Sequence, residues 1–333
     1  MKRLILSTLL IWLIQSGFAG ENTLHGLFFG DYYWMAQHHN NELENKNGFW
    51  IRRVFVTFDR SINDNWDARI RFEMNSAGDF SSPDKLTPYI KDAYFRYQWN
   101  DTKIRLGISP TPSWYQVSKL WGYRHIERTP ALLQKMYGSR DLGIAIQGSM
   151  LSNQILYHVM LGNGSGLGSE TNKGKQFNAS LALPLKAFIV QLSGYYESLP
   201  DKQRRSLIQG LFGYHNENHR VGVLYARQQH KTTMDKRPLS ILSFFGSKRF
   251  TNRLGLFARW DHTFDSNPKG DQITFFPLYP KAAADIFIAG LDIRVEKEIH
   301  ILPNIEAVTY AENDQNTQPR SDLLLRLTFY AKL

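Results

Sequence analysis

Apolar and polar residues alternate strictly along one short segment of the chain. Between residues 66 and 75, Trp66, Ala68, Ile70, Phe72 and Met74 are apolar, and the residues between them are charged or polar. Successive side chains of a β-strand point to opposite faces, so this pattern predicts a strand with one apolar and one polar face. A strand of a soluble sheet can show the same pattern, and this segment alone does not say what the apolar face contacts.

The same period of two recurs along the chain and predicts sixteen strands. Short links such as 100–101 follow the even-numbered strands, and long polar links such as 163–175 follow the odd-numbered ones. Strands of roughly ten residues joined by alternating short turns and long loops are typical of bacterial outer-membrane barrels. The predicted strands are 24–36, 49–60, 66–75, 92–99, 103–108, 141–147, 154–162, 177–183, 187–197, 206–215, 220–229, 239–248, 253–264, 284–296, 302–311 and 321–333.

We therefore predict an all-β fold, a 16-stranded antiparallel transmembrane β-barrel. In lipid, every backbone N–H and C=O group must be hydrogen-bonded within the protein, so the sheet must close and leave no edge. The apolar faces then contact lipid, and the charged faces line a lumen. A lumen enclosed by sixteen strands is too wide for side chains alone to fill, so another part of the chain must narrow it.

Residues 1–19 are predicted to be a signal peptide, and residues 20–333 to be the barrel domain. Lys2 and Arg3 precede an apolar run at residues 4–14, and Ala19 ends a small-residue cleavage motif. The apolar run is shorter than the roughly 20 residues of a membrane-spanning helix. We expect export to the outer membrane of a bacterial cell, where lipid surrounds the barrel.

Composition excludes several classes of function. The chain has no cysteine, which rules out disulfides and thiolate metal sites. Phosphate-binding loops, zinc-protease motifs and nucleophile elbows do not occur, so we predict no enzyme activity, no metal and no cofactor.

The pair His38-His39 lies in a predicted outer loop, where solvation is favoured over metal binding. The formal net charge is +10, but the arginines alternate with apolar residues along strands, which suits a lumen better than a nucleic-acid surface.

The longest interruption of the strand pattern is the segment 109–139, the third predicted outer loop. It carries four basic residues against the single acid Glu127, with aromatic residues between them. A long loop of this composition within a β-protein is more often functional than structural. It can project outward as a lid or fold inward and line the pore. Its candidate solute contacts, at a predicted constriction, are Lys119, Arg124, Arg128, Lys135, Tyr115 and Trp121.

Two alternatives stay open for the aromatic residues of this segment, and two for the inward-facing arginines of the strands. The aromatic residues can contact a solute, but packing of the loop against the barrel wall is favoured. The inward-facing arginines of the strands can guide anions, or they can pair with acids on neighbouring strands and keep the lumen wet. These candidate wall residues are Arg53, Arg69, Arg71, Arg96, Arg105, Arg259 and Arg326. Inward-facing acids nearly balance them, so the charge argument for anions rests on residues 109–139.

Several motifs resemble the phosphate-selective porin O/P family. They are Gly48-Phe49-Trp50-Ile51-Arg52-Arg53, Asp92-Ala93-Tyr94, Arg105-Leu106-Gly107, Gly138-Ser139-Arg140-Asp141-Leu142-Gly143 and Gly162-Asn163-Gly164. The resemblance implies a trimeric porin whose third loop folds into the lumen as the constriction. It also implies a preference for anions through arginines of the pore wall, and Arg53 and Arg105 match motif positions.

The predicted function is passive diffusion of small hydrophilic solutes, with a mild preference for anions such as phosphate, through a homotrimeric outer-membrane porin. One alternative is a porin specific for a sugar or an organic acid, without anion preference. A secreted β-rich binding protein is a further alternative. Nucleic acid is not an expected partner.

Overall fold

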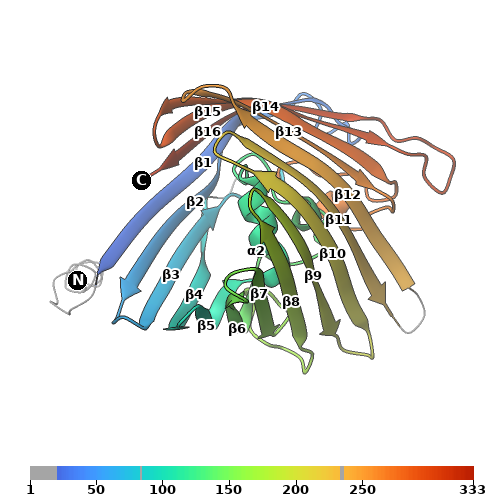
Figure 1. Cartoon of the computed structure of the whole chain (residues 1–333). Helices are drawn as coiled ribbons and strands as arrows, with labels where there is room; N and C mark the ends of the chain where they lie inside the picture. The colour runs from blue at the N-terminus through green and yellow to red at the C-terminus, as the bar shows by residue number, and fades with distance from the viewer. Residues whose placement is uncertain (1–20, 83–84, 233–235) are drawn as a thin grey trace, which may run out of the picture.

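The computed structural model describes residues 21–82, 85–232 and 236–333, and these form a closed antiparallel barrel of sixteen strands (Figure 1). Each strand pairs with the next, and β16 pairs with β1. The predicted signal peptide, residues 1–19, lies outside the described residues. The strands are β1 (Asn22–Gln37), β2 (Asn47–Ser61), β3 (Trp66–Asn75), β4 (Thr87–Trp99), β5 (Thr102–Pro110), β6 (Arg140–Met150), β7 (Ile155–Gly162), β8 (Gln176–Leu185), β9 (Phe188–Ser198), β10 (Arg204–His215), β11 (His219–Lys231), β12 (Lys236–Arg249), β13 (Leu254–Thr263), β14 (Ala284–Glu296), β15 (Ile299–Tyr310) and β16 (Asp322–Lys332).

The predicted strand number is confirmed, but several strands extend further toward the long links than predicted. The predicted long link at 230–238 is largely strand, because β11 ends at Lys231 and β12 begins at Lys236. The predicted link at 198–205 is reduced to residues 199–203. Polar residues at these strand ends carry no apolar alternation, so the sequence pattern ended before the backbone pairing did.

The apolar face of each strand lies on the outside of the barrel. In β3, Ile70 and Phe72 are exposed, whereas the neighbouring Glu73 is 1% exposed. In β3 the alternation read from the sequence therefore separates an apolar outer face from a polar and charged inner face. Later strands also bury apolar residues inside the barrel, such as Phe257 and Leu302, which cluster with residues of the segment 109–139. An apolar outer surface of this kind is typical of a barrel surrounded by lipid.

Two β-bulges break this alternation and turn extra basic residues inward. Phe29 pairs with Arg53 but Gly30 pairs with Ile51, which leaves Arg52 as the extra residue of β2. A similar shift in β4 leaves Lys91 as the extra residue. A bulge places consecutive side chains on the same side of the sheet. Arg52 is consequently only 3% exposed, and Lys91 only 8%.

The segment between β5 and β6 contains two helices, α2 (Pro112–Trp121) and the single turn α3 (Pro130–Leu133). Pro112 occupies the first turn of α2, and Gly122 ends it in the left-handed conformation at φ +74°. Its buried residues include Trp114, Val117 and Trp121, spaced three and four apart. Figure 1 shows α2, which contacts the five consecutive strands β7 to β11.

None of the helices in the described residues is long and apolar enough to cross a membrane.

Replacing Gly107 in β5 with alanine is expected to destabilise the barrel. Gly107 has φ +126°, and a Cβ atom there would lie 2.1 Å from the carbonyl oxygen of Ala93 on β4. Backbone strain and this clash together are expected to cost about 2 kcal/mol or more. Urea titration of the folded barrel in detergent measures the loss. The matched control is Gly210→Ala, because a Cβ at Gly210 would meet no atom within 4 Å. Equal destabilisation of the two variants would contradict this reading.

Candidate functional site

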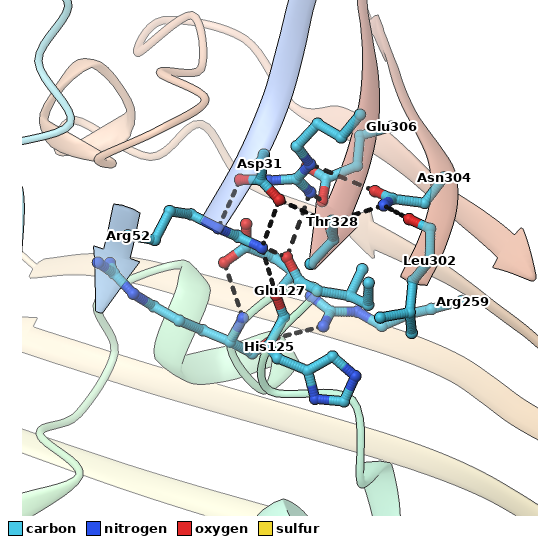
Figure 2. Close-up of polar contacts among 12 residues, drawn as sticks. Asp31, Arg52, His125, Glu127, Arg259, Leu302, Asn304, Glu306 and Thr328 are labelled. Carbon is cyan, nitrogen blue, oxygen red and sulfur yellow. Dashed lines mark hydrogen bonds and ion pairs between the residues drawn. The ribbon is translucent and has the colours of Figure 1, made fainter. Parts of the chain in front are cut away.

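Three arginines of the barrel wall hold the backbone of residues 125–128 (Figure 2). Arg52 of β2 donates from Nη1 to the carbonyl oxygen of Ile126 at 2.8 Å and from Nη2 to that of His125. Arg326 of β16 donates to the same Ile126 oxygen at 3.2 Å. Arg259 of β13 donates to the carbonyl oxygen of Arg128. The middle of the segment 109–139 is therefore fixed from three different strands.

Each of these arginines is also paired with a buried carboxylate. Arg52 Nε lies 2.7 Å from Asp31 Oδ2. Arg259 pairs with Asp261, and Arg326 pairs with Glu306. The three carboxylates are at most 2% exposed, so removal of any one arginine would leave a buried charge without its partner. This group of three pairs is called the anchor network below.

The anchor network corrects the predicted role of two wall residues. The side chains of Arg259 and Arg326 are 0% exposed, and their donors are engaged with carboxylates and loop carbonyls. A permeating anion cannot reach them. They face the interior as predicted, but they position the loop and do not line an open path.

The other predicted wall arginines mostly pair with acids across neighbouring strands, which favours the second of the two alternatives left open by the sequence. Arg105 is the exception, since its Nη1 donates to the amide oxygen of Gln147 at 2.8 Å. The cross-strand pairs, with their N–O distances, are Arg53–Glu73 at 3.4 Å, Arg69–Asp59 at 2.6 Å, Arg71–Asp92 at 3.3 Å and Arg96–Asp67 at 2.6 Å.

A cavity of about 400 Å³ lies beside residues 124–139, and we call it the basic cavity. Two acids line it, Glu73 and Glu197, and both are ion-paired, with Lys91 at 3.1 Å and Arg205 at 2.9 Å respectively. Three cations of the segment 109–139 also line the cavity, namely Arg124, Arg128 and Lys135, and within the described residues no ion pair holds them. The basic residues that line it are Arg53, Lys91, Arg124, Arg128, Lys135 and Arg205.

Two further cavities adjoin the basic cavity. An outer cavity of about 520 Å³, which includes Lys269, shares Lys135 and Arg205 with it. An inner cavity of about 410 Å³ includes Arg71 and Lys332. Among the residues that the structure describes, Arg124 alone lines both the basic and the inner cavity. Arg124 therefore stands between them.

The loop arginines keep their charge despite burial. Burial lowers the pKa of Arg124 to about 9, and nearby Arg140 and Arg53 act in the same direction. Burial lowers the pKa of Arg128 to about 10, with Arg53 again contributing. Both values lie above 7, so both guanidinium groups are protonated at neutral pH. Burial also lowers the pKa of the Lys135 ammonium.

The aromatic residues of the segment divide between packing and a separate cavity. Trp121, a predicted solute contact, is 1% exposed, and its Nε1 donates to the carbonyl oxygen of Glu127 at 2.8 Å. Its ring meets Phe245 of β12 edge-on, so packing replaces the predicted solute contact. Lys119 and Tyr115 lie together, with Nζ 4.5 Å from the ring centre. They line a fourth cavity of about 310 Å³, which shares no lining residue with the basic cavity.

The histidine pair of the first long link is not solvated as predicted. His38 is 0% exposed, and its Nδ1 accepts a hydrogen bond from the backbone of Asn40 while its Nε2 faces the carbonyl oxygen of Pro277 at 3.1 Å. His39 Nδ1 lies 2.9 Å from Asp322. Ligand atoms of His38, His39 and Asp322 lie within 4.8 Å of one another. Both nitrogens of His38 already have hydrogen-bond partners, and the cluster ties this link to β16.

Acidification is expected to loosen the loop through His125. Burial lowers the pKa of His125 to about 3, and its ring lies 4.5 Å from that of Tyr330. A histidine in the unfolded chain has a pKa of about 6.5. Between these two pKa values, His125 binds a proton more readily when it is exposed than when it is buried. The free energy that holds the loop in place therefore falls as pH drops below about 6.5. From pH 7 to pH 5 the expected loss is about 1–2 kcal/mol.

Current recordings at pH 7 and pH 5 test this expectation. Wild-type channels are expected to show more current fluctuation at pH 5, and His125→Phe channels, which keep an aromatic ring, are expected not to respond. The same pH response in both proteins would assign the effect to another group.

Comparison with known proteins agrees with the barrel fold. A family model described as phosphate-selective porin O and P matches residues 25–216. A search of the curated proteins found no match. The similar solved structures named next are 10–11% identical to this chain, so they bear on the fold alone. Three of them are an anion-selective porin from Comamonas acidovorans (TM-score 0.71, 10% identity, 94% of this chain and 100% of that chain), in-vitro-folded OmpT of Vibrio cholerae (TM-score 0.67, 10% identity, 95% and 100%) and the channel DcaP of Acinetobacter baumannii (TM-score 0.64, 11% identity, 96% and 99%).

Proposed function

This chain belongs to the phosphate-selective porin O and P family and is a diffusion channel of the bacterial outer membrane, and we propose that its pore mildly prefers anions such as phosphate. One observation carries the preference. Arg124, Arg128 and Lys135 all line the basic cavity, and no ion pair among the described residues holds their charges. Lysine and arginine side chains at a pore favour anions.

The segment 109–139 is proposed to fold into the lumen and to form the constriction. Its backbone accepts hydrogen bonds from β2, β13 and β16, while α2 contacts β7 to β11. These strands lie on widely separated parts of the barrel wall. A segment that reaches the inward-facing side chains of all of them must cross the interior, and this supports the inward fold.

The proposed anion path runs through the three adjoining cavities. An anion would enter the outer cavity near Lys269, pass Lys135 and Arg205 into the basic cavity, and then pass Arg124 into the inner cavity. The path is narrow and its walls have a low dielectric constant, which strengthens the electric field of each charge that lacks an ion-pair partner. Three of the predicted contacts take part in this proposal, namely Arg124, Arg128 and Lys135, together with the predicted wall residue Arg53. The predicted contacts Lys119, Tyr115 and Trp121 do not.

The assembly and the processing of the chain are also proposals. We infer a homotrimer surrounded by outer-membrane lipid, since one similar structure, that of Vibrio cholerae OmpT, is of a trimer form. Residues 1–19 are proposed to be a cleaved signal peptide, as their charged start and apolar run suggest. Detergent extraction followed by electrophoresis before and after heating tests the assembly, with a heat-sensitive trimer as the expected result.

The reversal potential of the wild-type channel tests the anion preference. The purified protein in a planar bilayer with a tenfold KCl gradient is expected to give a potential of the sign that chloride permeation produces. A potential of the opposite sign would contradict the proposal. A potential near zero would favour the alternative of a porin without anion preference.

A further inference from the structure

We propose that the cavity of about 310 Å³ beneath α2 is a second solute site, one that binds a neutral, hydroxyl-rich molecule of the size of a monosaccharide. We call this cavity the alcove. It lies between one face of α2 and the inner wall of the barrel, and Tyr115, Gln147, His158, Ser180 and Gln191 are among its lining residues. The proposal rests on the protein being a channel, but not on its anion preference.

Two buried polar side chains of the alcove have hydrogen-bonding atoms without protein partners. His158 of β7 is 3% exposed, and neither of its ring nitrogens has a partner among the described residues. Gln191 of β9 is also 3% exposed, and its Oε1 atom has no partner in the described residues. Leaving such groups unpaired in a buried site costs free energy, and native proteins rarely do so. Water or a bound solute must therefore meet them.

The lining chemistry selects the class of solute. A neutral imidazole offers one donor and one acceptor, an amide oxygen is an acceptor, and the hydroxyls of Ser180 and Tyr115 can do either. Sugar hydroxyls both donate and accept, so they match this mixed set. The cations Lys103 and Lys119 face one acid, Asp101, so the charge excess is smaller than in the basic cavity. The volume lies at the lower end of the roughly 300–1,000 Å³ of small-molecule pockets.

The alcove is separate from the proposed anion path. It has no lining residue in common with the basic cavity or the inner cavity. Asp101 and Asn153, which also line it, belong to the short turns between β4 and β5 and between β6 and β7. The alcove therefore lies toward the short-turn end of the barrel. A solute there meets α2 through Tyr115 and Gln116.

Current recordings with D-glucose test the proposal. Glucose added at the short-turn side of wild-type channels in a planar bilayer is expected to reduce the KCl current saturably. Triethylene glycol, with few hydroxyl groups, is expected to reduce it only in proportion to its concentration. The variants His158→Phe and Gln191→Leu are each expected to weaken glucose binding about tenfold, because each leaves sugar hydroxyls unpaired.

Two histidine variants control this experiment. His158→Gln keeps a donor and an acceptor, and its glucose affinity is expected to stay within about threefold of wild type. His262→Phe makes the same substitution as His158→Phe at a partly exposed position of β13, and it is expected to leave the glucose response unchanged. A variant whose conductance without glucose equals that of the wild-type channel is folded. If His158→Phe does not insert, Gln191→Leu decides the outcome.

Two outcomes would overturn the proposal. A glucose effect that does not saturate in wild-type channels would mean that the alcove holds water only. Equal glucose affinity in wild-type, His158→Phe and Gln191→Leu channels would place the sugar elsewhere. Failure of the anion preference appears separately, as the sign of the reversal potential, and leaves the glucose result interpretable.

Discussion

Replacing Arg326 with methionine is expected to release the loop from the barrel wall and to raise the single-channel conductance. The substitution removes the hydrogen bond to the carbonyl oxygen of Ile126 and leaves Glu306, which is 2% exposed, without its ion-pair partner. Breaking a buried pair in this way costs about 3–5 kcal/mol. This loss is expected to loosen the loop and not the barrel wall, because the wall strands remain hydrogen-bonded to one another. Conductance and current noise in a planar bilayer measure the loosening of the loop.

A rescue variant and a matched control make this prediction specific. Arg326→Met combined with Glu306→Leu removes both charges and is expected to recover much of the lost stability, as apolar replacements of buried pairs do. The control Arg69→Met breaks the ion pair between Arg69 and Asp59, whose side chains are 31% and 27% exposed respectively. Because this pair is partly exposed, its loss is expected to lower the free energy of unfolding by about 1 kcal/mol or less. Unchanged conductance in the folded Arg326→Met protein would mean that the loop does not form the constriction.

Replacing Arg124 with glutamate is expected to reverse the ion preference of the channel. Arg124 lines both the basic and the inner cavity, and its pKa of about 9 keeps it charged at pH 7. One unit charge at about 5 Å from an ion in water contributes about 0.8 kcal/mol, or about fourfold in occupancy. The substitution changes the charge by two units, so the anion-to-cation permeability ratio is expected to fall by at least about tenfold. Reversal potentials measure this ratio.

The control for Arg124→Glu is the same charge change on the outer surface. Lys281 is exposed in the link before β14, and Lys281→Glu is expected to shift the ratio much less because solvent and salt screen it. Equal shifts in the two variants would mean that the whole field of the protein sets the selectivity. Raising the ionic strength should reduce the Lys281→Glu effect more than the Arg124→Glu effect.

The sequence by itself determined the barrel. Lipid contacts one face of every strand and the interior contacts the other, so Ile70 and Phe72 alternate with polar residues without exception. The need to close a sheet in lipid then leads from the strand count to the architecture, with no tertiary information. The segment 109–139 was also identifiable, because the alternation stops there and basic residues gather.

Only the tertiary structure decided which charges are free. Arg52 and Lys91 were missed because bulges turn them inward, and the period of two gives no sign of a bulge. Arg259 and Arg326 look like any other inward-facing arginines in the sequence, but contacts more than a hundred residues away bury them against the loop. Whether a cation can meet an anion depends on its partners, and those partners come from distant strands. The sequence pattern therefore determined the barrel and which face of most strands is inward. Long-range packing, by contrast, left Arg124, Arg128 and Lys135 in the basic cavity without an ion pair among the residues that the structure describes.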